Sequence, residues 1–210
     1  MNKTKSISVT QKKVVITLSG TSGTASITGI GGLTKTATFA TSLTITGTNF
    51  VTANATAYAA VGITLTAALG VLTFTNATSD SGFGSAMITN ATGNLSGAVV
   101  VTSNKVYLGG YKRVALLFRN ASLTGSAALV INTSLDEIGT TIPATTASNI
   151  WIDNVTNAIT EDLTRVNGKT PTSAGDTLLW LSREAIVNWI ELVVTKVTDG
   201  THTSYVLVEE

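Results

Sequence analysis

The sequence predicts a mainly β protein, with a small α+β module of strands and one helix at residues 1–97 followed by an antiparallel β-sandwich or jelly-roll-like domain at residues 98–210. Three observations predict this class. Only 12% of residues are charged, so Thr, Ser, Asn and Gly supply the polarity, and Thr fits a half-buried strand. Short apolar or alternating runs closed by Gly recur along the chain. The 43% of hydrophobic residues in a chain of 210 is enough to form a packed core.

The first elements are strands separated by glycine. The run "KKVVITLSG" at residues 12–20 is short, apolar and closed by Gly, which is the pattern of a strand and its end. Two further β segments, at residues 24–28 and 35–40, follow around a Gly-rich turn at residues 29–32.

The next stretch, "TSLTITGTNFVTANATAYAAVG" at residues 41–62, combines Thr and Asn with a helical spacing of small and apolar residues. Its Ala content favours a helix, and burial of one face would outweigh the poor propensity of Thr and Asn. The face expected to be buried is Phe50, Ala53, Ala57, Tyr58 and Val61.

The ends of this helix have recognisable signals. Ser42 or Thr41 can cap the first free amides, and Gly62 supplies a left-handed stop. Because Gly47 weakens the first turn, we expect the helix to run from about residue 48 to residue 60.

After the helix, "GITLTAALGVLTFTNA" alternates in polarity and predicts a hairpin that turns near residues 68–70. A last short strand of the first module is expected at residues 86–89. The Gly- and Ser-rich segment near residues 93–97 predicts the boundary between the two modules.

The second module is predicted from six strands. The closing pair is joined by "TDGTHT", which reads as a hairpin loop with an Asp-Gly turn. A long polar loop at residues 164–176, around Pro171, is the expected place for contacts with a partner. The six strands are expected at residues 98–102, 113–119, 127–132, 176–182, 189–197 and 204–210.

Composition excludes several classes of protein. The chain has no Cys, which excludes disulfides, thiol nucleophiles and Cys-based zinc sites. The first residues lack an apolar core and no apolar run has the length of a membrane span, so we expect neither a secretory signal nor a membrane anchor. The net charge is +1, and the Lys residues near the start are too few to predict nucleic-acid binding.

No residue set predicts catalysis, a cofactor or a metal site. His202, the only histidine, is expected in the solvated Asp-Gly loop, and no "GxSxG" elbow accompanies it. Two acidic pairs, Asp136–Glu137 and Glu161–Asp162, match no calcium-loop spacing and are interpreted as solvated turns. We therefore expect a protein that is not an enzyme.

Two further features have a structural and a functional interpretation. The segment "GIGG" at residues 29–32 lacks the spacing of a phosphate loop and is interpreted as a turn. Aromatic faces stack on sugar rings, but Trp180 and Trp189 lie inside apolar strands and are expected in the core. Trp151 is the tryptophan to test at a surface.

The first half resembles a module that recurs in structural proteins of tailed bacteriophages, particularly phages of Bacteroidetes. The resemblance covers residues 23–77 and rests on a Gly-Thr-rich strand pair, "ATFATSLT", "NFV", an Ala-rich helix ending "AVGI", and the alternating hairpin with "GVLTFTNA". Gly47 within the start of the helix departs from this pattern. The second half is similar, in pattern, to β-sandwiches that phages use as capsid decoration or auxiliary proteins; "YKRVALLFRN", "ALVINTSLDEIGTTIP" and "WIELVVTKVTDGTHTSYVLVEE" carry this likeness.

These resemblances imply a virion structural protein of the auxiliary or decoration type, made in the host cytoplasm and bound to the capsid exterior. Its partners would be the major capsid protein or other virion proteins, with no nucleic acid and no membrane. The alternative is a tail or fibre component that binds a host surface glycan through Trp151 and residues 164–176. The family implies no catalytic residues.

Overall fold

A computed structural model describes residues 4–77, 85–107, 113–120, 127–134, 142–143, 153–155, 175–181, 189–196 and 202–209. As the sequence predicts, the fold is mainly β with antiparallel sheets, and α1 (Leu43–Ala59) is the only helix in the described part of the chain. The strands are β1 (Thr4–Ser8), β2 (Gln11–Ser19), β3 (Gly23–Ile30), β4 (Leu33–Thr38), β5 (Thr64–Ala68), β6 (Val71–Thr75), β7 (Met87–Gly93), β8 (Ser96–Ser103), β9 (Val106–Tyr107), β10 (Arg113–Asn120), β11 (Ala127–Ser134), β12 (Ile142–Pro143), β13 (Asp153–Val155), β14 (Gly175–Leu181), β15 (Trp189–Lys196) and β16 (His202–Glu209).

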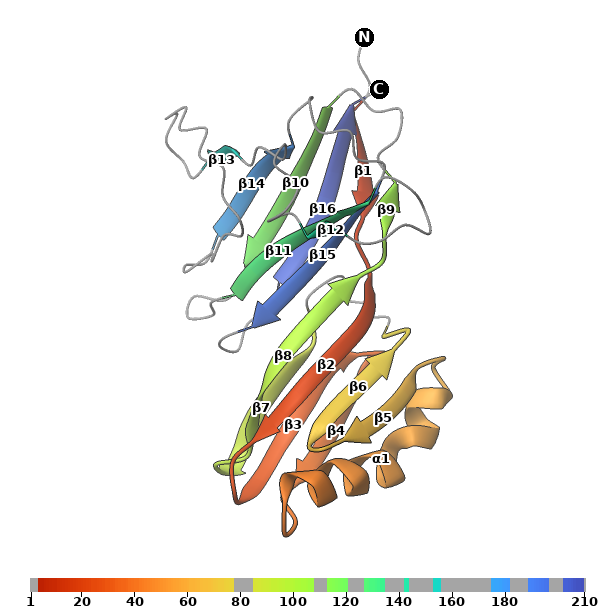
Figure 1. Cartoon of the computed structure of the whole chain (residues 1–210), viewed down its shortest axis with the longest axis vertical. Coiled ribbons are helices and arrows are strands. Elements are labelled where there is room, and N and C mark those ends of the chain that lie inside the picture. The colour runs from red at the N-terminus through yellow and green to blue at the C-terminus, as the bar shows by residue number, and fades with distance from the viewer. Residues whose placement is uncertain are drawn as a thin grey trace.

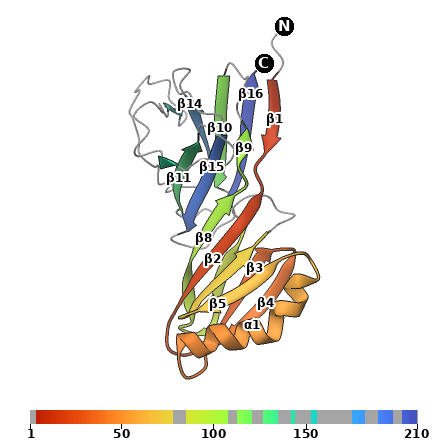
Figure 2. The ribbon, with the colours of Figure 1, turned by 45° about the vertical axis from the view of Figure 1, so that its right-hand side comes forward.

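The strands form three sheets (Figure 1). The largest has eight strands in the order β12-β11-β15-β8-β2-β6-β5, with β9 paired to β15 off this path. The second sheet has the order β1-β16-β10-β14-β13, and the third has the order β4-β3-β7. Turning the molecule shows α1 covering the open side between β4 and β5, the edge strands of two different sheets (Figure 2).

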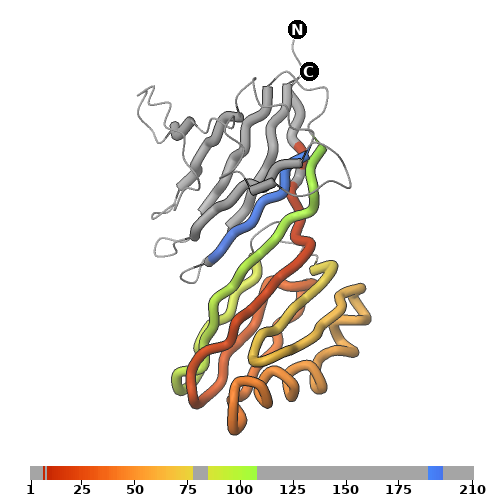
Figure 3. The backbone as a smooth tube through the Cα atoms, viewed as in Figure 1, coloured from red at the N-terminus to blue at the C-terminus, as the bar shows by residue number. Residues whose placement is uncertain are grey.

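The eight-stranded sheet runs through the whole length of the molecule. In the helix-bearing half, which consists of α1 and strands β2 to β8, strands β2, β5, β6 and β8 face the small sheet (Figure 3). In the other half, the sheet continues through β15 and β11 beside the five-stranded sheet (Figure 1). Strand β8 pairs with β2 on one side and with β15 on the other, from Val99↔Lys196 to Thr102↔Val193. The predicted module boundary at residues 97 and 98 therefore falls inside one strand, and the division into two modules stays a prediction.

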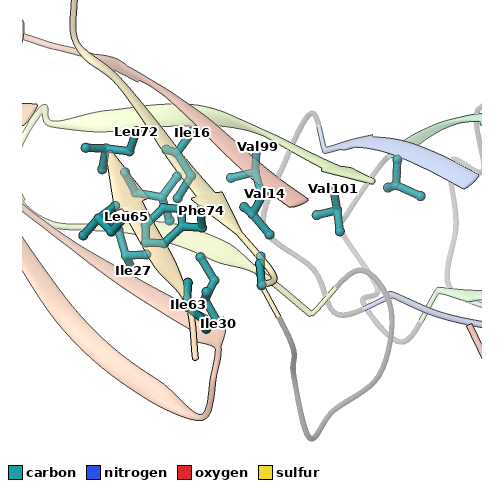
Figure 4. Packing of buried hydrophobic residues seen from close by; sticks show 14 of the residues in the cluster. Val14, Ile16, Ile27, Ile30, Ile63, Leu65, Leu72, Phe74, Val99 and Val101 are labelled. Carbon is teal, nitrogen blue, oxygen red and sulfur yellow. The ribbon is translucent and has the colours of Figure 1, made fainter. Parts of the chain in front are cut away.

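The core of the helix-bearing half lies between the sheets and under the helix. Alternate residues of β2 and β6, among them Ile16, Leu72 and Phe74, are fully buried and face Ile27 from β3 (Figure 4). The same buried cluster continues along the sheet into the other half through Val99, Val101, Val106, Ile190, Leu192 and Val194.

The helix begins earlier than the sequence predicts. The Ser42 hydroxyl accepts a hydrogen bond from the Ile45 N–H (3.2 Å), which confirms the cap, and Gly62 has the expected positive φ of 78°. Gly47 does not delay the helix. It is buried, because its lack of a side chain lets the helix approach Ala67 and Gly70 of the β5–β6 hairpin.

The buried face of α1 differs in part from the prediction. Phe50 and Tyr58 are buried as expected, but Ala53 and Val61 are exposed. The remaining buried positions are Thr46, Gly47 and Asn54.

Two of these are polar side chains whose hydrogen bonds are made locally, which removes the cost of their burial. Thr46 Oγ1 donates to the Ser42 carbonyl (2.8 Å), and Asn54 Nδ2 donates to the Phe50 carbonyl (2.9 Å). A scale of hydrophobicity alone does not identify such positions as core.

The connection between the last two strands is not the predicted hairpin. β15 lies in the eight-stranded sheet, whereas β16 pairs with β1 and β10 in the five-stranded sheet. The chain thus crosses between sheets after β15, as it does between β10 and β11. An Asp-Gly dipeptide signals a turn, but it does not specify whether the strands on either side pair with each other.

A buried side chain joins the start of β2 to three other segments. Gln11 is 3% exposed, and its Nε2 donates to the carbonyls of Gly29 (3.0 Å) and Ala77 (3.3 Å), while its Oε1 accepts from the Ala86 N–H (3.2 Å). This amide therefore hydrogen-bonds backbone groups of three segments at one point of the core.

Candidate interaction surface

The residues considered for chemistry do not form a cluster in the described chain. His202 is the first residue of β16 and pairs with Asn120 of β10, so it lies at a strand end rather than in the predicted loop. The pairs Asp136–Glu137 and Glu161–Asp162, and also Trp151, lie outside the described residues. Across the residues that are described, no group of three or more His, Cys, Asp or Glu could hold a metal ion.

Two other predicted features can be placed. The "GIGG" segment at residues 29–32 forms the end of β3 and the turn into β4, as expected. The polar loop at residues 164–176 lies outside the described residues except for the first two positions of β14. Within the described part of the chain, no helix is both long enough and apolar enough to cross a membrane.

Charged residues are distributed very unevenly along the sequence. Between residues 36 and 104, Asp80 is the only Asp, Glu, Lys, Arg or His, although the whole chain has 25 Lys, Arg, Asp and Glu. This stretch includes α1 and strands β5 to β8, which form most of the helix-bearing half. The surface that residues 36–104 contribute is therefore almost uncharged, and the charges on the rest of that half are Lys12 and Lys13 of β2 and Lys35 of β4.

The outer face of α1 is the clearest part of this neutral surface. Figure 2 shows the helix on the outside of the molecule, with one side turned away from both sheets. Its exposed residues are Thr44, Ile45, Thr48, Asn49, Thr52, Ala53, Thr56 and Ala59. We call these residues the threonine face.

The hydroxyl groups of this face are partly used within the helix. Thr48 Oγ1 donates to the Thr44 carbonyl and Thr52 Oγ1 donates to the Thr48 carbonyl, both at 3.0 Å. The hydroxyl protons of Thr48 and Thr52 are therefore already donated to the helix backbone, and their oxygens remain able to accept hydrogen bonds from water.

An exposed leucine lies at the turn between β5 and β6, close to the start of α1. Leu69 is 85% exposed and has φ 50°, and the next residue, Gly70, has φ 79°. Positive φ at both central residues is the signature of a type I′ hairpin turn, in which Asn-Gly is favoured over a leucine. The predicted turn position is confirmed.

An aromatic pair lies where β9 meets β15. The rings of Tyr107 and Trp189 have centroids 4.8 Å apart, and Tyr107 is 51% exposed. Trp189 is half-buried, so it is less enclosed than the sequence predicts for a core residue. It lies on the face of β15 opposite to the buried Ile190 and Leu192.

The comparisons with known proteins found no relative: no protein-family model, no curated protein and no solved structure matches the chain.

Sequence reasoning missed the threonine face as a unit. The signal was present in the sequence as Thr44, Thr48, Thr52 and Thr56, four threonines at a spacing of four residues. This spacing places side chains on one side of a helix, but it became informative only once the opposite side was known to be buried.

Proposed function

We propose that the chain is a non-enzymatic structural protein of a bacteriophage virion, most simply an auxiliary or decoration protein on the capsid exterior. The observation that supports this role is the low charge of α1 and strands β5 to β8, since Asp80 is the only charged residue between positions 36 and 104. Interface cores are depleted of charged residues, because a charge that leaves water needs a partner to offset the desolvation. A neutral half is suited to contacts with other coat proteins.

The resemblance of residues 23–77 to a module of phage structural proteins supports the same role, as does the mainly β fold. In this proposal the neutral half docks on the capsid lattice. The half that carries most of the charged residues projects into solvent.

Peptide mass spectrometry of purified phage particles tests this proposal. We expect the protein in particles that have been banded on a density gradient, in proportion to the major capsid protein. A particle preparation without the protein would contradict a virion role. A low-resolution map of intact particles would then separate the capsid from the tail.

One observation favours the alternative, a tail or fibre component that binds a host glycan. The Tyr107–Trp189 pair offers a partly exposed aromatic surface, and sugar rings stack on such surfaces. A glycan array, together with adsorption assays of Tyr107→Ala and Trp151→Ala phages, tests this role. Silence on the array and unchanged adsorption would eliminate the alternative.

A further inference from the structure

We propose that β1 is a strap that closes over the edge of β16 and opens on a hinge at residues 9–10, while the rest of the fold stays intact. This conformational device belongs to the chain itself and does not depend on the virion role.

The place of β1 in the sheets is the first argument (Figure 1). Among the described strands that precede β9, it is the only one in the five-stranded sheet, where it lies at an edge and pairs with β16, from Thr4↔Glu209 to Ser8↔Tyr205. Strand β2 follows after two residues but lies inside the eight-stranded sheet, between β6 and β8. Because β1 and β2 belong to different sheets, β1 can leave β16 without breaking a bond of β2.

The two linking residues are fixed to the eight-stranded sheet. Val9 is buried, and the Thr10 N–H donates to Asn104 Oδ1 while the Thr10 carbonyl accepts from the Asn104 N–H, both at 2.9 Å. Asn104 directly follows β8, where the Ser103 hydroxyl accepts from the Leu192 N–H of β15 (2.8 Å). Since Thr10 is bonded through both of its backbone groups, an opening that starts at β1 should stop there.

Strand β1 contributes little packing of its own. Its sequence, "TKSIS", has one apolar residue, Ile7, which is only partly buried against the core cluster. Segments with few buried apolar contacts open locally at a free energy well below that of global unfolding. The closed strap nevertheless has a use, because it covers an edge of β16 that would otherwise expose a row of unpaired backbone groups.

A second edge strand of the same length provides an internal control. Strand β5 also has five residues and pairs with one strand, β6, from Thr64↔Thr75 to Ala68↔Val71. Unlike β1, it packs against α1 and contributes the buried Leu65 to the core. We expect β5 to stay closed until the whole chain unfolds, so an edge position alone does not make a strap.

Hydrogen exchange measured by NMR at single residues tests the strap. Successive residues of an antiparallel strand point their N–H groups to opposite neighbours, so the amides from Tyr205 to Val208 of β16 alternate between β1 and β10. We expect the β1-facing amides to exchange at least about a hundredfold faster than the β10-facing ones. Low concentrations of urea should not change the faster rate, because opening the strap exposes little surface.

The control amides are those of β6. Those that face β5 should exchange as slowly as those that face β2. Uniform exchange along β16 would overturn the inference. Fast exchange on the β5-facing side as well would reduce β1 to an ordinary frayed edge and would also overturn it.

The hinge is tested at the amide of residue 104, which donates to the Thr10 carbonyl. In the wild type this amide should exchange as slowly as those of β2. Asn104→Ala removes the Oδ1 that holds the Thr10 N–H, so the opening should extend through Thr10 and the residue 104 amide should exchange about tenfold faster.

The matched variant is Asn94→Ala. Asn94 Oδ1 likewise accepts backbone N–H groups, from Thr21 and Ser22, but at the other end of the β2–β8 pair. It should leave the residue 104 amide unchanged. An equal effect of both variants, or a residue 104 amide that is already fast in the wild type, would place the hinge elsewhere and contradict the proposal.

A disulfide can lock the strap, because the chain has no Cys of its own. Ser6 and Leu207 are Cα partners, so Ser6→Cys combined with Leu207→Cys places two thiols across the β1–β16 pair. In the oxidised variant the β1-facing amides should slow to the rate of the β10-facing ones, and reduction should restore the fast rate. Identical exchange in the oxidised and reduced forms would show that β1 does not open separately.

Discussion

Tyr58 places a hydroxyl group in the apolar core under α1. The residue is fully buried beside Phe74 (ring centroids 5.1 Å apart), and its hydroxyl has no hydrogen-bond partner among the described residues. A buried donor without a partner costs about 1–3 kcal/mol. The ring is well packed, so the cost belongs to the hydroxyl alone.

Tyr58→Phe should therefore leave the free energy of unfolding at pH 7 unchanged or raise it by about 1 kcal/mol. Urea denaturation measures this change. The matched control is Tyr107→Phe, which removes an exposed hydroxyl and should have no effect. A loss of more than about 1 kcal/mol in Tyr58→Phe would indicate that the hydroxyl has a partner.

The same residue gives the chain a specific alkaline sensitivity. Burial raises the pKa of the Tyr58 phenol from 10.0 to about 12. Between pH 10 and about 12 the native state keeps the phenol proton that the unfolded state has lost. The contribution of Tyr58 to the free energy of unfolding is therefore complete below pH 10 and is lost as the pH rises to about 12. Comparing the urea midpoints of the wild type and Tyr58→Phe from pH 9 to pH 12 isolates the contribution of the Tyr58 phenol to stability. Parallel curves would contradict the shift.

Leu69 is unfavourable at its position for two reasons, its left-handed backbone and its exposed side chain. Leu69→Asn should stabilise the chain by about 1 kcal/mol, because Asn tolerates the left-handed region and Asn-Gly favours this turn. Leu69→Ala keeps a Cβ in the same backbone conformation and should gain less. Thermal melts of both variants check this order, and equal melting temperatures would contradict the backbone argument.

At the scale of the element, α1 shows how tertiary packing tolerates a residue that weakens an isolated helix. Gly47 lowers helix propensity, yet it lies where the helix approaches the β5–β6 hairpin. A Cβ added to Gly47 would lie 3.4 Å from Ala67 Cβ and 3.7 Å from Leu72 Cδ2, which is ordinary contact. The position has room for one methyl group and no more.

Gly47→Ala should therefore raise the free energy of unfolding by about 1 kcal/mol, the difference in helix propensity between the two residues. Gly47→Leu should lower it, because the longer side chain has to displace the hairpin. Urea denaturation followed by circular dichroism at the helix band measures both. Destabilisation by Ala would show that the helix already touches the hairpin more tightly than these distances indicate.

The strands could be predicted well because their signals are local. The alternation in "GITLTAALGVLTFTNA" and the glycines between strands placed β2 to β6 within two or three residues of their observed ends. The threonines and asparagine on α1 were harder to place, because Thr46 and Asn54 are buried by satisfying their own hydrogen bonds. Sheet partners could not be predicted, since β15 and β16 are neighbours in sequence and belong to different sheets.

The candidate surface was only partly predictable for a related reason. The low charge and the many hydroxyl groups are visible in the sequence, but the side of α1 that faces solvent depends on tertiary packing. The partial exposure of Trp189 also depends on packing, because an apolar strand gives no indication of which of its two faces is covered.

At the scale of the whole molecule, the shared sheet connects the two halves. Strands β2 and β8 pair along their length, and β8 also pairs with β15. One continuous buried cluster accompanies them. Separating the halves would break strand pairing and expose this cluster.

We therefore expect both halves to unfold in one transition. The three tryptophans all follow residue 150, whereas α1 is the only helix in the described chain, so tryptophan fluorescence and helical circular dichroism report on different halves. Their midpoints in urea should coincide. Two separate midpoints would instead support independent modules at residues 1–97 and 98–210.

The uneven distribution of charge also affects the stability of the chain at low pH. Proteins lose stability at low pH mainly because carboxylates that are ionised in the native state become protonated. Of the 12 Asp and Glu residues, Asp80 is the only one before residue 136. Acid therefore has one carboxylate to protonate in the first 135 residues, so any loss of stability at low pH should come from the carboxylates after residue 135 and reach the helix-bearing half only through the sheet that the two halves share.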